Sequence, residues 1–313
     1  MSLQKQFHVN FQVADIQTLQ ADWLLSKNVT LNILRLDKLH SVVSGNKWFK
    51  LKHYLAEAVE QKQTVATFGG AWSNHIVAVA YCCQQVGLQS IGIIRGEKPA
   101  VLSDTLTQAV EYGMELQFVT REEYNSRKKE VAGKQETGNR EWETGNEIYW
   151  INEGGYGSLG AKGAADIGTK YDLSSYTHII AGVGTGTMLA GLIMSAKPGQ
   201  AVIGISAMKG NHELEQQVSD LLPKNGNHPP FTILHDYHFG GFGKHPKSLL
   251  SFMNEVYEQY SLPLDIVYTG KVFYAIKDLV EKNYFEPGSK LMMIHSGGLQ
   301  GNAGVKDGKN LAF

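Results

Sequence analysis

Hydrophobic positions along the chain change their period repeatedly, from the two-residue alternation typical of strands to the wider spacing typical of helices. Short apolar runs predict strands over 29–37, 64–68, 89–94, 115–119, 148–152, 178–181, 201–206 and 290–295. Between these runs the helical spacing predicts helices over 48–61, 73–86, 104–112, 122–130, 161–171, 188–196, 213–222, 248–260 and 272–282. Strands that alternate with helices in this way predict an α/β protein with open, doubly wound parallel sheets.

The polar stretch 133–146 is the least periodic part of the chain, and we expect it to be an exposed loop. Residues 1–43 carry weak signals apart from the strand over 29–37. The sequence contains no internal repeat and no low-complexity segment, so a domain boundary has to be inferred from the functional site.

Composition changes this picture little. The chain has 313 residues, of which 42% are hydrophobic and 19% are charged, as in an ordinary soluble globular protein long enough for two domains. A net charge of -1 gives no reason to expect a nucleic acid or an anionic membrane as partner. The first residues do not resemble a signal peptide, and no apolar run is long enough to cross a membrane.

The two cysteines, Cys82 and Cys83, are neighbours in a predicted helix and point to different faces. We therefore expect no disulfide and a reducing, cytoplasmic compartment. No set of Cys and His residues has the spacing of zinc ligands, so we expect no metal.

The stretch 44–50, SGNKWFK, reads as a tight turn that runs into a helix. Gly45 permits an unusual backbone shape, and Asn46 is expected to cap the helix. Lys47 then lies near the positive end of the helix dipole and is partly fixed by packing, and both effects favour the neutral amine that attacks a carbonyl. Taken alone, the stretch fits a surface lysine better, but two later glycine-rich stretches favour chemistry.

The first of these stretches joins an apolar strand to an apolar helix. It consists of Gly182, Val183, Gly184, Thr185, Gly186 and Thr187. Its backbone amides can converge at a helix start, which suits a phosphate. The lysine of a nucleoside triphosphate loop and the acidic residue of a dinucleotide site are both absent, whereas pyridoxal phosphate fits. A tight turn without a ligand would explain the same glycines.

The second stretch, 69–75, reads GGAWSNH and opens another helix. Its amides, with Ser73 and Asn74, could hold a carboxylate, and Asn74 could also reach a ring oxygen. Simple capping by Ser73 or Asn74 explains the same residues, and His75 alone fits a position on the helix face.

Two further positions carry candidate chemistry. Ser296 follows an apolar strand in the sequence HSGG, and the carboxyl end of a strand in an open sheet faces the ligand crevice. Tyr268 stands at a helix start and fits either an acid/base group or a core tyrosine. Lys50, three positions after Lys47, is expected to be solvated.

Together these stretches resemble the tryptophan-synthase-like (fold type II) pyridoxal phosphate enzymes. Within them, the chain is most similar to the 1-aminocyclopropane-1-carboxylate deaminase / D-cysteine desulfhydrase family. The motifs that carry the resemblance appear in order over most of the chain: SGNKWFKL around Lys47, GGAWSNH at 69–75, GVGTGT at 182–187, VYTGK at 267–271 and HSGG at 295–298.

The resemblance implies pyridoxal 5'-phosphate as the cofactor, bonded to Lys47 through its aldehyde. The 182–187 loop would hold the phosphate, Asn74 would contact the 3-hydroxyl oxygen and Ser296 would face the pyridine nitrogen. The implied catalytic residues are Lys47, Ser73 and Tyr268, with Ser73 as a nucleophile or as a carboxylate-binding and proton-handling group. The implied substrate contacts are Trp72, Ser73, Asn74, His75 and Tyr156.

The resemblance also implies two domains with the site in the cleft between them. Residues 1–48 and 158–313 would form the large cofactor-binding domain, and residues 49–157 a small inserted α/β domain. The family further implies a homodimer that acts on a small amino acid.

The implied activity is that of a deaminase or carbon–sulfur lyase that removes an α-proton and expels a β-substituent. Family deaminases carry an additional tyrosine shortly before the last glycine pair, where this chain has Met292, Met293 and Ile294. This departure favours conversion of D-cysteine to pyruvate, sulfide and ammonia over ring opening of 1-aminocyclopropane-1-carboxylate. The same motifs also fit an L-amino-acid lyase or β-replacement synthase of the same fold, or a non-catalytic small-molecule binding protein.

Overall fold

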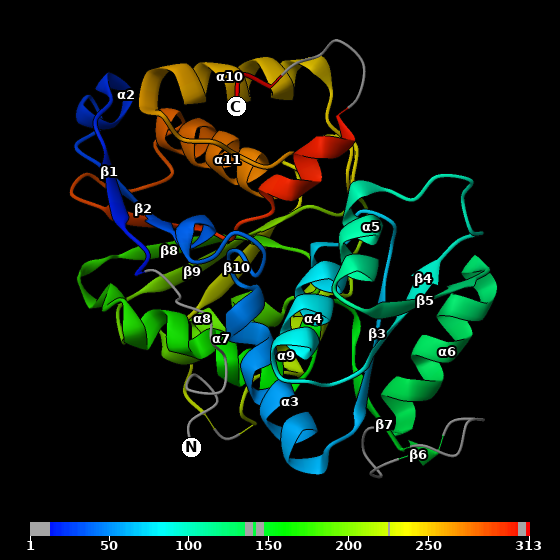
Figure 1. Ribbon diagram of the computed structural model, residues 1–313. Helices are drawn as coiled ribbons and strands as arrows, with labels where there is room; N and C mark the ends of the chain where they lie inside the picture. The colour runs from blue at the N-terminus through cyan, green and yellow to red at the C-terminus, as the bar shows by residue number, and fades with distance from the viewer. Residues whose placement is uncertain (1–12, 135–139, 142–146, 225, 306–310) are drawn as a thin grey trace.

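The computed structural model describes residues 13–134, 140–141, 147–224, 226–305 and 311–313, and it contains two sheets (Figure 1). The larger sheet has the order β1-β2-β11-β8-β9-β10, and the smaller has the order β5-β4-β3-β7-β6. All neighbouring strands run parallel except the pairs β1–β2 and β6–β7 at the sheet edges. The predicted α/β class with open parallel sheets is confirmed.

The strands of the larger sheet are β1 (Ile16–Leu19), β2 (Thr30–Arg35), β8 (His178–Val183), β9 (Ala201–Ser206), β10 (Phe231–Leu234) and β11 (Lys290–His295). Alternate residues of these strands face two separate cores, since Leu31, Ile180 and Met293 belong to one and Leu34, Ile179 and Met292 to the other. The first core is closed by α2 (Asp22–Leu25), α10 (Lys247–Tyr260) and α11 (Thr269–Glu281), and the second by α7 (Ser158–Lys170), α8 (Thr187–Ser195) and α9 (Leu214–Ser219).

The strands of the smaller sheet are β3 (Thr64–Gly69), β4 (Ser90–Arg95), β5 (Met114–Val119), β6 (Arg140–Glu141) and β7 (Glu147–Ile151). Its apolar faces are likewise covered by helices: α3 (Lys47–Gln61), α4 (Asn74–Gln85) and α5 (Asp104–Glu111) on one side and α6 (Arg121–Lys134) on the other (Figure 1). Parallel sheets are stable when helices cover both faces in this way.

Each sheet reverses its strand order once. In the larger sheet, β8, β9 and β10 follow one another outward, whereas β11 returns to the other side of β8. In the smaller sheet, β3, β4 and β5 go outward and β7 returns beside β3. Ligands of open α/β sheets bind at the carboxyl ends of strands at such reversals. These ends carry the loops 182–187, 296–298 and 69–75, whose residues were predicted to carry the chemistry.

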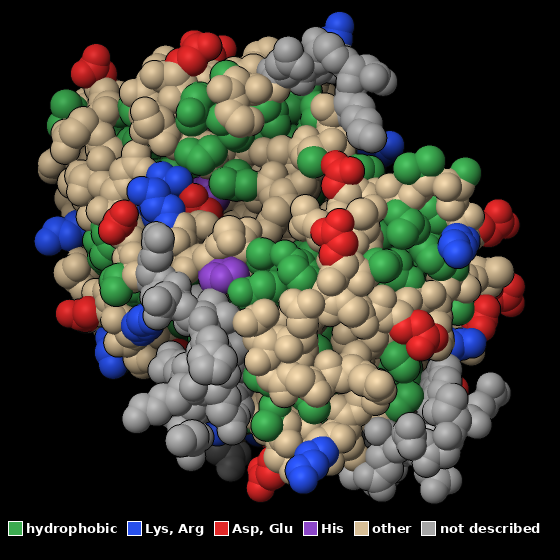
Figure 2. Space-filling view, viewed as in Figure 1, with side chains coloured by type: hydrophobic (Ala, Val, Ile, Leu, Met, Phe, Trp, Pro, Cys, Tyr) green, Lys and Arg blue, Asp and Glu red, His purple; other side chains and the backbone are tan. Residues whose placement is uncertain are grey.

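Several details differ from the predictions. The hydrophobic pattern did not reveal the short edge strands β1 and β10 or the one-turn helix α2. Most of the predicted loop 133–146 lies outside the described residues, while 133–134 end α6 and 140–141 form β6. No helix among the described residues is long and apolar enough to cross a membrane. On the face in Figure 2, acidic and basic side chains are interspersed, as expected for a net charge of -1.

Candidate functional site

Lys47 is the first residue of α3, and its amine donates a hydrogen bond to the side-chain Oδ1 of Asn46 at 2.9 Å. The side-chain amide of Asn46 donates in turn to the sulfur of Met188, 3.1 Å away. Because Met188 directly follows the 182–187 loop, Asn46 links the predicted reactive lysine to the predicted phosphate loop. These two stretches, far apart in the sequence, therefore lie side by side.

The predicted side-chain caps are absent. Asn46 occupies the N-cap position of α3, but its side chain makes no capping hydrogen bond, because it is directed to Lys47 and Met188 instead. Ser73 occupies the N-cap position of α4, also without a capping bond from its side chain. Capping therefore does not account for Asn46 or Ser73.

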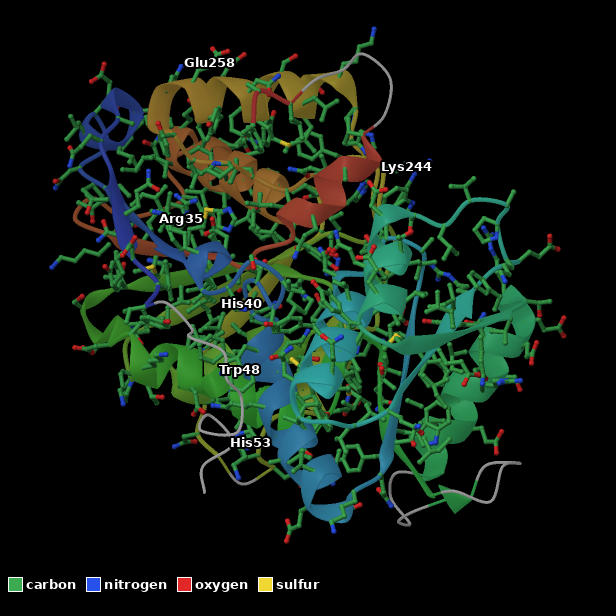
Figure 3. The ribbon with its side chains drawn as sticks, in the orientation of Figure 1. Arg35, His40, Trp48, His53, Lys244 and Glu258 are labelled. Atoms are coloured by element: carbon green, nitrogen blue, oxygen red, sulfur yellow. The ribbon has the colours of Figure 1, made fainter. Side chains whose placement is uncertain are left out.

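Lys47 is half-buried, and this burial lowers its pKa to about 8 against the opposing influence of the Asp265 charge. A lysine with this pKa has a much larger neutral fraction at neutral pH than an exposed lysine. Figure 3 labels Arg35 at the end of β2 and Trp48, the residue that follows Lys47 on α3. The amine can therefore attack a carbonyl, as predicted for this position.

Tyr268 packs directly against the 182–187 loop. A Cβ atom on Gly184 would lie 2.7 Å from the Tyr268 hydroxyl oxygen, and a Cβ atom on Gly182 would lie 3.0 Å from the Tyr268 Cβ. Any larger residue at Gly184 would displace the phenol. The glycine spacing of the loop is thus matched to this tyrosine, and Tyr268 lies at the site rather than in a core.

The far end of the loop offers hydroxyl groups at the start of α8. Thr185 and Thr187 lie 3.0 Å apart through their side-chain oxygens, and one of them donates to the other. Gly186 between them has a φ of 80°, a left-handed conformation that glycine adopts readily. The hydroxyls and the free amides of the helix start together form the kind of cradle that binds a phosphate.

The acidic neighbours of Tyr268 set both its position and its protonation. Asp265 is 1% exposed, and its carboxylate accepts the backbone N–H groups of Val267, Tyr268 and Thr269 at 2.7 to 3.0 Å. Burial, with the charges of Asp265 and Glu153, raises the pKa of Tyr268 well above its usual value. The phenol therefore keeps its proton at neutral pH and can donate it.

Ser296 lies against the turn that carries Lys47. The backbone N–H of Asn46 donates to the Ser296 carbonyl at 3.2 Å, and a Cβ atom on Gly45 would lie only 1.8 Å from the same oxygen. Gly45 also has a φ of 67°, a left-handed conformation that glycine adopts readily. The turn therefore requires glycine both for this conformation and for the close approach of the Ser296 carbonyl. The end of β11 and the start of α3 thus form one wall of the site.

Two side chains at the start of α4 carry buried polar atoms without a partner among the described residues. The Oδ1 atom of Asn74 is buried without a hydrogen-bond partner among the described residues, and so is the Nδ1 atom of His75. Burial and the nearby charges of Lys50 and Lys47 hold the pKa of His75 well below its usual value. His75 is therefore neutral and close to both lysines.

The structure does not connect two of the predicted substrate contacts to this centre. Trp72 is 42% exposed and packs beside Gly304, where an added Cβ atom would lie 3.6 Å from the indole. Tyr156 donates its hydroxyl to the Gln217 carbonyl at 3.1 Å. No contact of the described residues joins either ring to Lys47, and their substrate roles remain predictions.

The predicted solvation of Lys50 is wrong. This lysine is 6% exposed, because α3 packs against both α7 and α4. Burial and the charge of Lys47 hold its pKa well below the usual value. Its amine makes no hydrogen bond to another described residue.

These unpaired atoms test whether the site fits a phosphate-bearing aldehyde such as pyridoxal phosphate. The fit needs a partly neutral lysine, a phosphate cradle and polar side chains that lack partners within the protein. Lys47 and the 182–187 loop, joined through Asn46, supply the first two features, and the buried Oδ1 atom of Asn74 supplies the third. The residues therefore fit such a group.

The three residues at the position of the additional family tyrosine do not line the site. Met292, Met293 and Ile294 are interior residues of β11, each 0% exposed, and they fill the two cores of the larger sheet. A difference at these positions reflects core packing. They therefore provide no argument against ring opening.

Comparisons with known proteins identify the family of the chain. Residues 24–297 match the model of a family described as pyridoxal-phosphate dependent enzymes. A putative 1-aminocyclopropane-1-carboxylate deaminase of Thermotoga maritima is 30% identical over 88% of this chain and 92% of its own length. A bifunctional D-cysteine desulfhydrase/1-aminocyclopropane-1-carboxylate deaminase of Arabidopsis thaliana is 28% identical over 88% of this chain and 74% of its own. The crystal structure of an ACC deaminase homologue superposes with a TM-score of 0.74, at 24% identity over 94% of this chain and 92% of that one.

Proposed function

The chain belongs to the family of pyridoxal-phosphate-dependent enzymes, and we propose that it eliminates the β-substituent of a small amino acid, with D-cysteine as the preferred substrate. The reaction would convert D-cysteine and water to pyruvate, hydrogen sulfide and ammonia. The observation that carries the proposal is the contact of Asn46 with both Lys47 and Met188, because it joins the reactive amine to the phosphate cradle.

Four parts of the chain would hold the cofactor. Lys47 would bond to its aldehyde, the 182–187 loop would bind its phosphate, Asn74 would contact the ring oxygen and Ser296 would face the ring nitrogen. When bound, pyridoxal phosphate withdraws electrons from the α-carbon of the amino acid and makes its proton acidic. The remaining work, moving protons and orienting the substrate, belongs to the protein.

Lys47 and Tyr268 fit the two proton transfers that an elimination needs. The Lys47 amine, once free, can accept the α-proton because burial favours its neutral form. Tyr268 keeps its proton and can donate it to the departing thiolate. Ser73, half-buried at the start of α4, would bind the substrate carboxylate beside the helix amides and assist proton transfer.

A specific observation keeps 1-aminocyclopropane-1-carboxylate deamination as the second candidate. Relatives from Pyrococcus abyssi and Thermotoga maritima carry that name, and the Arabidopsis relative carries both. The α-carbon of 1-aminocyclopropane-1-carboxylate has no hydrogen, so a base directed at an α-proton serves D-cysteine and not this substrate. The role of Lys47 as base therefore favours elimination.

The proposal extends to the organisation of the protein. We infer a large domain of residues 1–48 and 158–313, a small domain of residues 49–157, a homodimer and a cytoplasmic location. The two sheets and the position of Lys47 at the start of α3 support this division.

One titration tests the proposal against each competing activity. The purified protein is followed by visible absorbance while D-cysteine, L-cysteine and 1-aminocyclopropane-1-carboxylate are added in turn, with sulfide and ammonia measured in each case. Sulfide from D-cysteine alone supports the proposal. Sulfide from L-cysteine would indicate an L-amino-acid lyase or synthase, and ammonia from the cyclopropane alone would establish the second candidate. Cofactor absorbance without any turnover would indicate a binding protein.

A further inference from the structure

The loop 40–43 leads the chain from the larger sheet to the predicted reactive lysine. It comes after the short helix η1 (Leu36–Lys38) and ends just before the turn that opens α3. Leu39, the residue before the loop, packs in a core of the larger sheet, whereas Val43 at its end is fully buried in a core of the smaller sheet. The loop therefore crosses from one core to the other directly before Lys47.

His40 pairs two backbone groups of this loop. Its Nδ1 atom accepts the backbone N–H groups of Val42 and Val43, at 3.0 and 3.1 Å. Because a backbone N–H can only donate, Nδ1 must carry a lone pair, and the neutral ring must carry its proton on Nε2. The ring donates that proton to the hydroxyl oxygen of Tyr81 on α4, 3.4 Å away, and the two rings pack with centroids 5.1 Å apart. His40 thus fixes the loop internally and attaches it to α4.

Gln300 pairs two more backbone groups of the same loop. Its side-chain amide donates to the carbonyls of Ser41 and Val42, at 3.3 and 3.1 Å. Gln300 lies on η4 (Leu299–Gly304), a short helix that comes after β11. Helices and strands pair backbone groups with one another, whereas here two side chains provide the partners. The shape of the loop therefore depends on His40 and Gln300.

The turn after the loop carries the predicted reactive amine. Asn46 accepts a hydrogen bond from Lys47 and donates its backbone N–H to the Ser296 carbonyl at 3.2 Å. The backbone N–H of Gly45 donates to the Leu36 carbonyl at 2.9 Å. Both backbone bonds form only when the loop brings the chain back toward η1 and the end of β11. The conformation of the loop therefore decides where the amine lies.

The bonds of the His40 ring to the backbone require its neutral form. The ring is half-buried, and burial lowers its pKa, so it is neutral at neutral pH and accepts a proton in acid. A proton on Nδ1 would turn this acceptor into a donor that faces two donors, and both bonds would be lost. The titratable group that α4 presents to the ring is Tyr81, whose pKa is raised by burial, so it stays uncharged in acid.

We propose that His40 is a positioning residue for Lys47: its neutral ring holds the loop 40–43 and, through this loop, the turn that carries the Lys47 amine. Gln300 completes the support from η4. Acid loosens the loop, because the two backbone N–H groups lose their acceptor when the ring is protonated. The inference rests on the proposed role of Lys47, and it adds a proton-sensitive support to the cofactor site.

Amide hydrogen exchange of the cofactor-free protein tests the loop directly. The N–H groups of Val42 and Val43 should be protected at pH 7.5, relative to the unfolded chain, and should lose about tenfold of this protection at pH 5, the effect of one hydrogen bond. His40→Leu provides no acceptor and should show the low protection at both pH values. His40→Asn should keep the high protection at both, because an asparagine oxygen accepts backbone N–H groups shortly after it and does not titrate.

Titration of apo-protein with pyridoxal phosphate at pH 7.5, followed by visible absorbance, tests the link to Lys47. His40→Leu should bind about tenfold more weakly than wild type, because binding must then also order the loop, and His40→Asn should stay within about threefold. The matched control is His53→Leu on α3, since His53 is also half-buried with a pKa lowered by burial; Figure 3 labels both histidines. This control should match wild type in binding and in the exchange of Val42.

Several results would overturn the proposal. They are equal protection of wild type at the two pH values, an acid loss that persists in His40→Asn, and variants that differ in exchange but bind pyridoxal phosphate alike. Nitrogen-15 NMR of wild type needs no substitution, and a proton on Nδ1 of His40 at neutral pH would overturn the proposal even if His40→Leu failed to fold. Wild-type protein that binds no pyridoxal phosphate would instead show that the proposed function is wrong, a separate failure, since the exchange measurement needs no cofactor.

Discussion

Lys47 and Lys271 are two buried lysines with the same lowered pKa, about 8, and the same acidic neighbour, Asp265. Each lies in the first turn of a helix, α3 or α11. They differ in what the amine meets. Lys47 is half-buried and donates to a side chain beside the glycine loop, whereas Lys271 is 1% exposed and donates to the Gly241 carbonyl at 2.8 Å.

The difference between Lys47 and Lys271 shows that a lowered pKa reports only the burial of a lysine. The atoms around the amine decide whether it can react. Lys271 holds the loop 240–243, which carries Phe242 with its ring edge toward Tyr268, 6.1 Å between centroids. Lys271 therefore supports the site from behind. Lys47 shares that environment but faces the atoms predicted to react.

The largest expected effect separates the two lysines directly. Lys47→Ala should lower elimination activity by about 10⁴-fold, since it removes both the group that bonds to the cofactor and the base. Borohydride reduction of the wild-type holoenzyme, followed by peptide mass spectrometry, should place the label on Lys47. Lys271→Met is the control and should retain the label on Lys47. A label on Lys271 or Lys50 would reverse the assignment.

The second effect concerns Tyr268, whose phenol packs against the 182–187 loop and lies beside the loop that Lys271 holds. Tyr268→Phe should lower kcat for D-cysteine by about 10²-fold, because the ring remains while the proton donor is lost. Tyr274→Phe on the same helix is the matched control, since Tyr274 is 37% exposed, and its rate should stay at the wild-type value. Equal rates for Tyr268→Phe and wild type would remove Tyr268 from the proton transfers.

Local sequence signals could predict the sheets and the loops of the site, but not which polar side chains are buried there. The change of period between strands and helices reports which faces are apolar, so the parallel sheets followed from it. The 182–187 loop was recognisable because its glycines are required where Tyr268 packs against the backbone. The short edge strands β1 and β10 carry four residues each, too few for a clear alternation.

Lys50 and Asp265 could not be identified for a different reason. The spacing of hydrophobic residues in α3 suggests a helix with one apolar face. In the structure α7 and α4 cover α3 from two sides, so the burial of Lys50 depends on tertiary packing. Asp265 left a weak signal, an acidic residue four positions before Thr269 at a helix start. Its proximity to both lysines depends on how α11 packs beside the turn at Lys47.

The third prediction uses pH to isolate Lys271. The pKa of Lys271 falls from its usual 10.5 to about 8 on folding, so between these values the unfolded chain holds a proton that the folded chain lacks. The free energy of unfolding should therefore rise with pH in this window, by about 1.4 kcal/mol per pH unit from this group. Lys271→Met should lose that part of the slope in denaturant unfolding measured from pH 8 to 10. Lys277→Met, a half-buried lysine on the same helix, should keep it, and parallel curves for wild type and Lys271→Met would contradict the assignment.

The smallest expected effect tests whether the environment of Lys47 controls its reactivity. In apo-protein, the rate at which Lys47 bonds to pyridoxal phosphate should rise with pH and level off above about 8, because only the neutral amine attacks. Asn46→Asp places a carboxylate at the atom that accepts from the Lys47 amine, which favours the charged form and raises its pKa by about one unit. The rate at pH 7 should fall by about tenfold while the plateau at high pH stays unchanged, and stopped-flow absorbance measures both. A profile that does not move would mean that the Lys47 pKa is not what limits the attack. Lys47 and Lys271 would then differ only in which atoms they face.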